Sequence, residues 1–370
     1  MLFCRPQQLW LRVRPAKPAR SPNAFTLIEI LVVVSVVATL AAAILPSFRA
    51  AREKARTVVC AAHTAAIGRA AATYSTESTG WLCGSPGTSG SIMYSRTPEP
   101  LPAEEDIPTD PMQNWDYAGA LAPTYMNISL PANRALRMKQ VIIEVFACPS
   151  NHYYADPVAG ERASDGGPIG TFDRQPMVSY NTFRNFLLWP RTMVNRDPTR
   201  PWGPRAPNPQ ASFDTIGGNT IRPKNYRPHI DKIINPAAKA YLADGNRFTD
   251  EEARITYDME WNAKAGGAFA NGGPTLHNGH TVSGHPILSS YHYEKERGRP
   301  AYRHHASRNP GIVVNFFDSH SEFMAEAQSR EPDTWWPKGT IIPFSEFNEP
   351  SQRLIAPRID PMSPYYLVNR

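Results

Sequence analysis

A single carboxylate, Glu29, stands near the start of an otherwise uncharged apolar segment that runs from Phe25 to Leu45. As an α-helix this segment measures roughly 31 Å at about 1.5 Å per residue, close to the ~30 Å hydrocarbon core of a bilayer. An acid at the bilayer centre costs about 2.5–3.5 kcal/mol, and less near the edge, so such residues are usually functional and have a partner. The segment therefore predicts a membrane-spanning helix whose acid pairs with a cation.

A second group of residues suited to chemistry is a concentration of histidines late in the chain. Seven of the ten histidines lie there: His277, His280, His285, His292, His304, His305 and His320. Imidazole together with a carboxylate, such as Asp318 or Asp244, suits zinc and similar ions. Because the spacings match no metal motif, and adjacent residues of a strand point apart, we favour polar loop histidines over a metal site. The candidate ligands for a metal are His304, His305, Asp318 and His320.

Motifs of known enzyme classes do not stand out in this sequence. It contains no GxSxG, no HExxH, no paired CxxC and no glycine loop of the kind that cradles phosphate. Paired acids such as Glu104-Glu105 lie in polar surroundings and are interpreted as a solvated surface. We therefore predict a protein that is not an enzyme and that needs no cofactor.

The basic charge of the chain is concentrated ahead of the apolar segment. Residues 1–24 carry no acid and five basic side chains, Arg5, Arg12, Arg14, Lys17 and Arg20. The other 34 Lys and Arg face 33 Asp and Glu, so the formal net charge of +6 falls to about +1 beyond this leader. A basic flank of this kind predicts a cytoplasmic N-terminus, and the near-neutral remainder predicts no nucleic-acid partner.

The sequence after Leu45 predicts that the helix continues beyond Pro46. Proline removes a helix hydrogen bond and bends the helix, but residues 47–76 are rich in alanine and other helix formers. Apolar residues recur there at intervals of three or four, at Val59, Ala62, Ala66 and Ala70. This spacing predicts a narrow apolar stripe that packs on a globular domain.

The rest of the chain predicts a loop-rich antiparallel β domain. Proline accounts for 37 of 370 residues, about twice the usual ~5%. The clearest strand candidates are residues 141–146, 178–183 and 239–243, and residues 311–323 predict a hairpin. The fold class is thus α+β, in which a long kinked N-terminal helix, transmembrane in its first half, packs on an antiparallel sheet.

We divide the chain into four parts on this basis. Residues 1–24 form a basic leader, 25–45 the transmembrane half of the helix, 46–78 its exported half and 79–370 a globular domain. The domain contains an insertion at about 189–230 that is rich in proline, arginine, asparagine and glycine.

The cysteines beyond the leader are Cys60, Cys83 and Cys148. An odd number allows at most one disulfide and leaves one thiol free. We favour Cys60–Cys148, because this bond would connect the helix to the strand candidate at 141–146 across a long loop, for about 2–4 kcal/mol. The alternative is three unpaired thiols.

The junction Ala24-Phe25-Thr26-Leu27-Ile28-Glu29 resembles the processing site of type IV prepilins and type II secretion pseudopilins. In that family a dedicated peptidase cuts before the Phe and methylates the new amino terminus. With Phe25 as the first mature residue, Glu29 is the fifth and Pro46 the twenty-second, and both match the family. Ala24 replaces the usual Gly, which implies slower cleavage.

The hairpin at 311–323 resembles the closing motif of large pseudopilin-like proteins of planctomycete-type bacteria, where the turn usually reads Asp-Gly-His. Cys148-Pro149-Ser150 and Ala243-Asp244-Gly245 resemble further landmarks of that group. Ser319 replaces the usual Gly of the turn, and because type I′ turns need positive φ at both central residues, we expect a wider turn here.

The resemblance implies a pilin-like fold and a structural subunit for a pseudopilus or a type IV pilus-related fibre. Its partners would be prepilin peptidase, inner-membrane lipid and other pilin-like subunits, with Glu29 neutralising the Phe25 ammonium of a neighbour. The subunit would span the inner membrane once, with a cytoplasmic N-terminus and a periplasmic or extracellular domain. The calcium loop of the type II major pseudopilins has no residue-by-residue match here, so calcium is not predicted.

The alternative is a membrane-anchored or secreted binding protein, or a metal-dependent hydrolase, that uses the segment only for export. Ala41-Ala42-Ala43 offers a site for ordinary signal peptidase, with Ile44 as the new N-terminus. The apolar run is longer than the usual ~7–15 residues of a signal peptide, and Glu29 would have no role in one.

Overall fold

The computed structural model describes residues 26–84, 117–129, 144–151, 154–157, 175–176, 179–187, 223, 226–245, 247–248, 256–257, 266–267, 273–275, 302–306, 309–360 and 365–369. The chain divides into two compact units, residues 1–49 and residues 50–370. Helix α1 (Leu27–Glu77) contributes to both, and Pro46 lies inside it. The long helix and the antiparallel sheet domain confirm the predicted α+β, pilin-like architecture.

The second unit is built around an antiparallel sheet of five strands. These are β3 (Tyr180–Thr182), β4 (Ala240–Asp244), β8 (His304–Ala306), β9 (Asn309–Phe316) and β10 (Ser321–Ala325). The order is β10-β9-β4-β3, and β8 pairs with the beginning of β9, so that His304 lies opposite Gly311. The strands confirm the predictions at 178–183, 239–243 and 311–323.

Short elements surround this sheet. Strand β1 (Tyr154–Pro157) pairs with β2 (Gln175–Pro176) and β6 (Thr256–Tyr257), β5 (Arg247–Phe248) pairs with β7 (Gly266–Gly267), and β11 (Ile341–Pro343) pairs with β12 (Tyr365–Leu367). The other α-helices in the described ranges are α2 (Tyr117–Tyr125), α6 (Glu326–Ser329) and α7 (Glu349–Ile355). Single 3-10 turns are η5 (Arg184–Phe186), η7 (Ile230–Lys232), η8 (Pro236–Ala238), η9 (Gly273–Thr275), η10 (Pro332–Thr334), η11 (Phe344–Glu346) and η12 (Ala356–Arg358).

The central strands bury side chains on both faces of the sheet. On one face, Val313 and Leu242 pack with residues of α1. On the other face, Ile312 and Val314 pack with the C-terminal segment, including Trp335, which is fully buried. Because successive residues of a strand point to opposite faces, a strand buried on both sides has a continuous apolar sequence. This explains the run Ile312-Val313-Val314 that predicted the hairpin.

The buried face of α1 differs from the predicted stripe. Val59 is 41% exposed and Ala62 is exposed, so of the predicted set only Ala70 is buried. The buried residues of the helix are Cys60, Thr64, Ile67, Gly68, Ala70, Ala71 and Ser75. The rotation of the helix is fixed by its contacts with the sheet and by the bond from Cys60 to Cys148, rather than by the spacing of its alanines.

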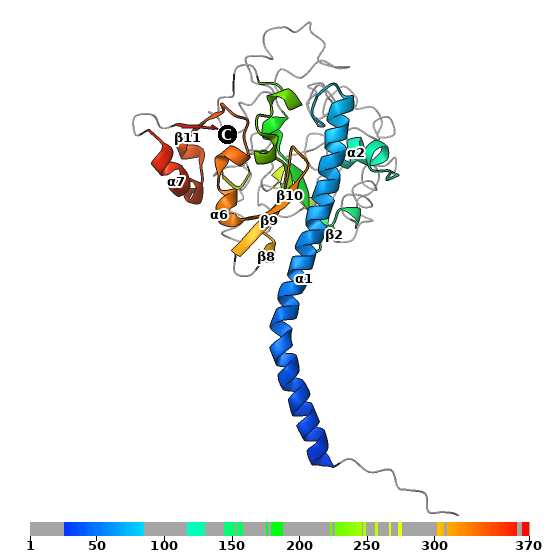
Figure 1. The fold of residues 1–370 in the computed structure, drawn as a ribbon. Helices are drawn as coiled ribbons and strands as arrows, with labels where there is room; N and C mark the ends of the chain where they lie inside the picture. Colours follow the sequence, from blue (N-terminus) through cyan, green and yellow to red (C-terminus); the bar gives the residue numbers. More distant parts are fainter. Residues whose placement is uncertain are drawn as a thin grey trace, which may run out of the picture. The chain divides into compact units, whose positions relative to one another are not determined.

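Gly68 permits the close approach of α1 to the sheet. A Cβ atom at this position would lie 2.2 Å from the Asn315 side-chain oxygen on β9, which is far inside van der Waals contact. One turn earlier, the Thr64 hydroxyl donates a hydrogen bond of 2.9 Å to Ser321 on β10. The C-terminal half of α1 therefore rests directly on the β9–β10 hairpin (Figure 1).

The turn of this hairpin is wider than a two-residue turn, as expected. The Phe316 amide donates to the His320 carbonyl at 3.0 Å, which leaves a three-residue loop, and Ser319 has φ = 72°. A three-residue hairpin loop commonly places one residue in this left-handed conformation, which glycine adopts more readily than serine.

Two other predictions for the domain have different outcomes. The strand prediction at 141–146 is wrong where the structure describes it, because Glu144 and Val145 lie in an exposed helical turn. Neither residue belongs to a strand of the sheet. The insertion at about 189–230 lies outside the described residues, apart from Pro223 and residues 226–230.

A buried amine connects the sheet to the C-terminal segment. Lys239, immediately before β4, is fully buried and donates hydrogen bonds to the carbonyl oxygens of Asp333 (2.5 Å) and Trp336 (2.7 Å). Burial lowers the pKa of the Lys239 amine from 10.5 to about 8, although the nearby Asp333 carboxylate opposes this shift. The net penalty on the charged form of the amine in the folded chain is then about 3 kcal/mol, at about 1.4 kcal/mol per pKa unit.

We expect this amine to make the free energy of unfolding depend on pH. Because its pKa is lower in the folded state, the unfolded chain binds more protons between pH 8 and 10.5, and stability rises with pH across this window. Between pH 7.5 and pH 9.5 the free energy of unfolding of the native chain, measured with denaturant, should rise by roughly 2 kcal/mol more than that of Lys239→Met. Lys54→Met removes an exposed amine of α1 and serves as control. If the free energy of unfolding of Lys239→Met changed with pH in parallel with that of the native chain, the lowered pKa of Lys239 would be contradicted.

Candidate functional site

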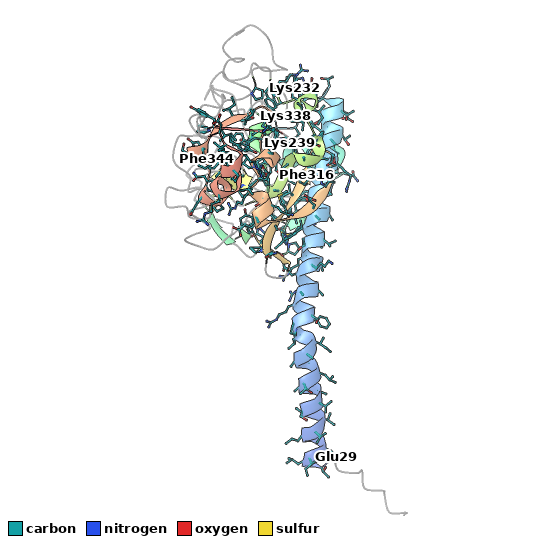
Figure 2. All side chains as sticks on the ribbon, turned by 60° about the vertical axis from the view of Figure 1, so that its left-hand side comes forward. Glu29, Lys232, Lys239, Phe316, Lys338 and Phe344 are labelled. Carbon is teal, nitrogen blue, oxygen red and sulfur yellow. A yellow bond between two sulfur atoms is a disulfide. The ribbon has the colours of Figure 1, made fainter. Side chains whose placement is uncertain are left out.

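Glu29 lies at the N-terminal end of α1 (Figure 2). A reciprocal pair of hydrogen bonds between Thr26 and Glu29 closes the first turn of this helix. The Thr26 amide donates to Glu29 Oε2 at 2.8 Å, and the Glu29 amide donates to the Thr26 hydroxyl oxygen at 3.3 Å. The Thr26 hydroxyl also donates to Oε2, at 2.9 Å. Such a capping box satisfies amide groups that have no partner at a helix start. Glu29 thus caps the start of α1, whether or not it also pairs with a cation on another molecule.

The following turns of α1 expose an apolar surface all round. Leu27, Val33 and Leu45 are 80%, 59% and 56% exposed, respectively, and the helix is long and apolar enough to cross a membrane. The hydroxyls of Ser35 and Thr39 donate to helix carbonyls at 2.8–3.0 Å. Because these groups bond within the helix, they place no unsatisfied donor toward lipid. Ala24 and Phe25 lie outside the described residues.

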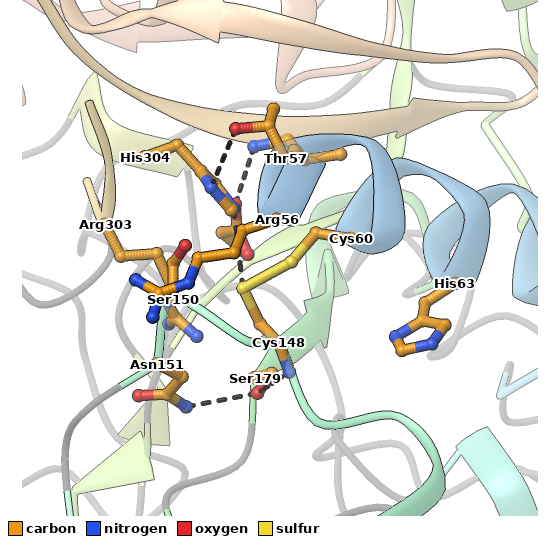
Figure 3. The surroundings of a disulfide bond; sticks show 12 residues. Arg56, Thr57, Cys60, His63, Cys148, Ser150, Asn151, Ser179, Arg303 and His304 are labelled. Atoms are coloured by element: carbon orange, nitrogen blue, oxygen red, sulfur yellow. Dashed lines mark hydrogen bonds and ion pairs between the residues drawn. A yellow bond between two sulfur atoms is a disulfide. The ribbon is translucent and has the colours of Figure 1, made fainter. Parts of the chain in front are cut away.

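In the second unit, Cys60 of α1 and Cys148 form a disulfide with a Cα–Cα distance of 5.4 Å (Figure 3). Both residues are buried, and the Cys148 amide donates to the Ser179 hydroxyl oxygen at 2.9 Å. The pair is the one favoured from the sequence, and Cys83 is a buried cysteine outside the disulfide. The bond links the helix to the segment that precedes the sheet.

His304, at the start of β8, lies beside this disulfide and is fully buried. Its Nε2 atom is 3.4 Å from Cys148 Sγ and 3.2 Å from Asp244 Oδ2, at the end of β4. Its Nδ1 atom is 3.2 Å from the Thr57 hydroxyl and 3.5 Å from Glu53 Oε1, both on α1 (Figure 3). The imidazole therefore connects the helix, the disulfide and the sheet.

Glu53 is the acidic member of this cluster on the helix. It accepts a hydrogen bond of 2.8 Å from the Ser150 hydroxyl and forms an ion pair of 3.4 Å with Arg56. Burial raises the pKa of the Glu53 carboxyl, but the Ser150 hydrogen bond and the charges of His304 and Arg56 outweigh it, so this pKa lies below its ordinary value. Glu53 is thus held as a carboxylate facing the imidazole.

The four candidate metal ligands do not come together as one site. His304 pairs with Gly311 at the beginning of β9, whereas Asp318 and His320 belong to the turn beyond Phe316 at the other end, roughly 16 Å along the strand. Asp318 Oδ1 is 2.5 Å from His320 Nδ1, and both side chains are about 40% exposed. They form a turn ion pair, and the side chain of His305 lies outside the described residues.

Sequence reasoning missed two members of the buried cluster. Glu53 was interpreted only as one of the charged residues of the helix, and Ser150 was noted only as part of the family-like Cys148-Pro149-Ser150 motif. Asp244 was one of two acids considered with the histidines, and it is fully buried beside His304. A useful signal is the position of Asp244 at the end of a strand whose residues are all buried, because an acid there needs a partner.

Residues 20–45 match the family model of the prokaryotic N-terminal methylation motif. No curated protein and no solved structure matches the chain. The motif is that of prepilin-type cleavage and methylation segments, and it coincides with the apolar part of α1. Motif and helix together define a membrane-anchored, single-pass protein. It carries a prepilin-type N-terminus and an α+β domain of pilin-like architecture.

Proposed function

We propose that this chain is a structural subunit that prepilin peptidase cuts between Ala24 and Phe25 and methylates at Phe25, and that assembles into a pseudopilus or a type IV pilus-related fibre. The observation that carries the proposal is the methylation motif at residues 20–45, which overlaps the capped, apolar first part of α1, where Glu29 is the single charged side chain between residues 25 and 45. The domain then serves as the body of the subunit rather than as an enzyme.

The charge of the leader supports an orientation. Residues 1–24 carry five basic side chains and no acid, so the N-terminus stays in the cytoplasm and the domain is exported across the inner membrane. The domain contains a disulfide, which suits an oxidising compartment outside the cytoplasm. Residues 25–45 span the membrane, and residues 46–78 form the exported part of the helix in this account.

The geometry of the first turn suggests how Glu29 takes part in assembly. Both hydrogen bonds from Thr26 go to Oε2, and the side chain is exposed, so Oε1 can accept from a cation on another subunit. Cleavage creates such a cation, the Phe25 ammonium. Two opposite charges are tolerated in an apolar bundle only when they pair, which selects neighbouring helices in one register.

Cleavage at Ala24 can be tested by changing that residue. In cells that express a prepilin peptidase, Ala24→Gly should speed the loss of the leader from the full chain, and Ala24→Leu should slow it, because the family favours a small residue before the cut. The rate is followed by gel shift and by intact mass. Ala43→Leu, at the alternative signal-peptidase site, is the control and should leave the rate unchanged. Leader loss that depends on Ala43 and not on Ala24 would contradict the proposal.

A further inference from the structure

We propose that, when its disulfide is reduced, the chain binds one zinc-class cation through Cys60, Cys148, His304 and Asp244. The metal would then replace the disulfide as the link between α1 and the sheet. Two thiolates, one imidazole and one carboxylate are ligands that zinc takes in tetrahedral structural sites. The inference goes beyond fibre assembly and does not depend on it.

The positions of the ligand atoms support a single ion. The sulfur atoms of Cys60 and Cys148 and a ring nitrogen of His304 all lie within 4.8 Å of one another. Asp244 Oδ2 is 3.2 Å from His304 Nε2, and all four residues are at most 3% exposed. An ion about 2.0–2.3 Å from each tetrahedral ligand atom holds those atoms less than 4.8 Å apart, so binding draws the two sulfurs and the imidazole inward, and Asp244 joins as the fourth ligand from the side of His304. The site is closed to solvent, as structural zinc sites are.

An independent observation concerns the carboxylate. Asp244 Oδ2 accepts a hydrogen bond of 2.6 Å from the Val313 amide, whereas Oδ1 has no hydrogen-bond partner among the described residues. A fully buried carboxylate oxygen without a partner is costly, because its hydration is lost and nothing replaces it. A bound cation would supply the missing interaction.

The other side of the imidazole is also arranged as a metal ligand requires. With Nε2 directed at the sulfur of Cys148, Nδ1 faces the Thr57 hydroxyl at 3.2 Å and Glu53 Oε1 at 3.5 Å. Histidines that bind metal usually donate their second N–H group to a carboxylate or another oxygen, which fixes the tautomer and the ring orientation. The Thr57 hydroxyl provides this oxygen at hydrogen-bond distance, and the Glu53 carboxylate, held by Ser150, lies next to it.

The disulfide and the metal site exclude each other, because the same sulfur atoms serve both. A dithiol reductant gives two electrons and two protons to the disulfide, which yields two thiols while the reductant becomes a disulfide. Binding of the cation then releases the two thiol protons, since thiolates are the ligands. In the oxidised chain the sulfurs are bonded to each other and are not thiolates, so the cation does not bind.

Cobalt(II) is a spectroscopic probe for this site. The full-length protein in detergent is reduced with a dithiol without oxygen, freed of reductant and titrated with Co²⁺. We expect thiolate-to-cobalt absorption that saturates at one ion per chain, that zinc abolishes, and that is absent from the oxidised chain. Cys148→Ser should eliminate it, and Glu53→Gln should weaken cobalt affinity roughly 10-fold. Cys83→Ser and His320→Ala, which lie outside the cluster, should not change it.

A second measurement covers the case in which the reduced chain loses part of its fold. Zinc should raise the melting temperature of the reduced chain and not that of the oxidised chain, because a ligand that binds only the folded state stabilises it. The inference is overturned by any of three results. These are no thiolate absorption at stoichiometric cobalt, absorption that is unchanged in His304→Ala and Asp244→Asn, or a melting temperature of the reduced chain that zinc does not shift.

Discussion

Glu29→Ala should abolish recovery of the subunit in assembled fibres while leaving the protein in the membrane. The apolar helix still inserts, because its length and hydrophobic surface are unchanged. Assembly, however, would bury the Phe25 ammonium of a neighbour without a partner. Breaking a buried charge pair costs about 3–5 kcal/mol, which corresponds to roughly 150- to 5,000-fold weaker association at each contact. Recovery is measured by shearing fibres from cells and quantifying the subunit in sheared and membrane fractions.

Glu29→Gln separates the two roles of this residue. Glutamine can still accept from the Thr26 amide, as in other capping boxes, but it carries no charge. We therefore expect Glu29→Gln to fail in assembly as Glu29→Ala does. Glu349→Gln, an exposed acid on α7, controls for the loss of a charge elsewhere. Normal recovery of Glu29→Gln in fibres would show that the capping bond alone is needed and would contradict the charge pairing.

Cys60→Ser should lower the free energy of unfolding of the second unit, residues 50–370, by about 4–5 kcal/mol. The disulfide closes a loop with a sequence separation of 88 residues, and the chain-entropy account gives about 3 kcal/mol for a 15-residue loop and 4.7 kcal/mol for a 100-residue loop. The measurement is denaturant unfolding of the full chain in detergent, without reductant and with a chelator, so that no metal replaces the bond.

Matched variants test whether this loss belongs to the disulfide. Cys148→Ser should lose as much as Cys60→Ser, and the double variant should lose little more, because either substitution already removes the bond. Cys83→Ser changes a buried cysteine outside the disulfide and should lose much less. An unfolding midpoint of Cys60→Ser equal to that of the native chain would contradict the role of the bond.

Sequence patterns predicted those elements whose partners are close to them in the chain. The apolar run through Ile312-Val313-Val314 followed by polar turn residues predicted the hairpin, because both strands and turn are adjacent in sequence. The rotation of α1 was not predictable in this way. Its buried face depends on Gly68 fitting against Asn315 and on the bond from Cys60, and both partners lie far away in sequence.

The buried cluster shows the same distinction. The histidines were grouped by their proximity in sequence, yet strand pairing separates His304 from His320 and brings it to Asp244 and Glu53. Those three residues come from β8, β4 and α1, and only the antiparallel register together with helix docking makes them neighbours. Residue types alone indicated that a carboxylate and an imidazole could meet, but not which ones.

The N-terminal residue of the mature protein tests the central claim most directly. The protein is isolated from the membrane or fibre fraction of its own cells, digested, and its first peptide identified by tandem mass spectrometry. A prepilin-type subunit predicts a peptide that begins at Phe25 with a methylated amino group. A peptide that begins at Ile44, or one that retains residues 1–24, would contradict the account.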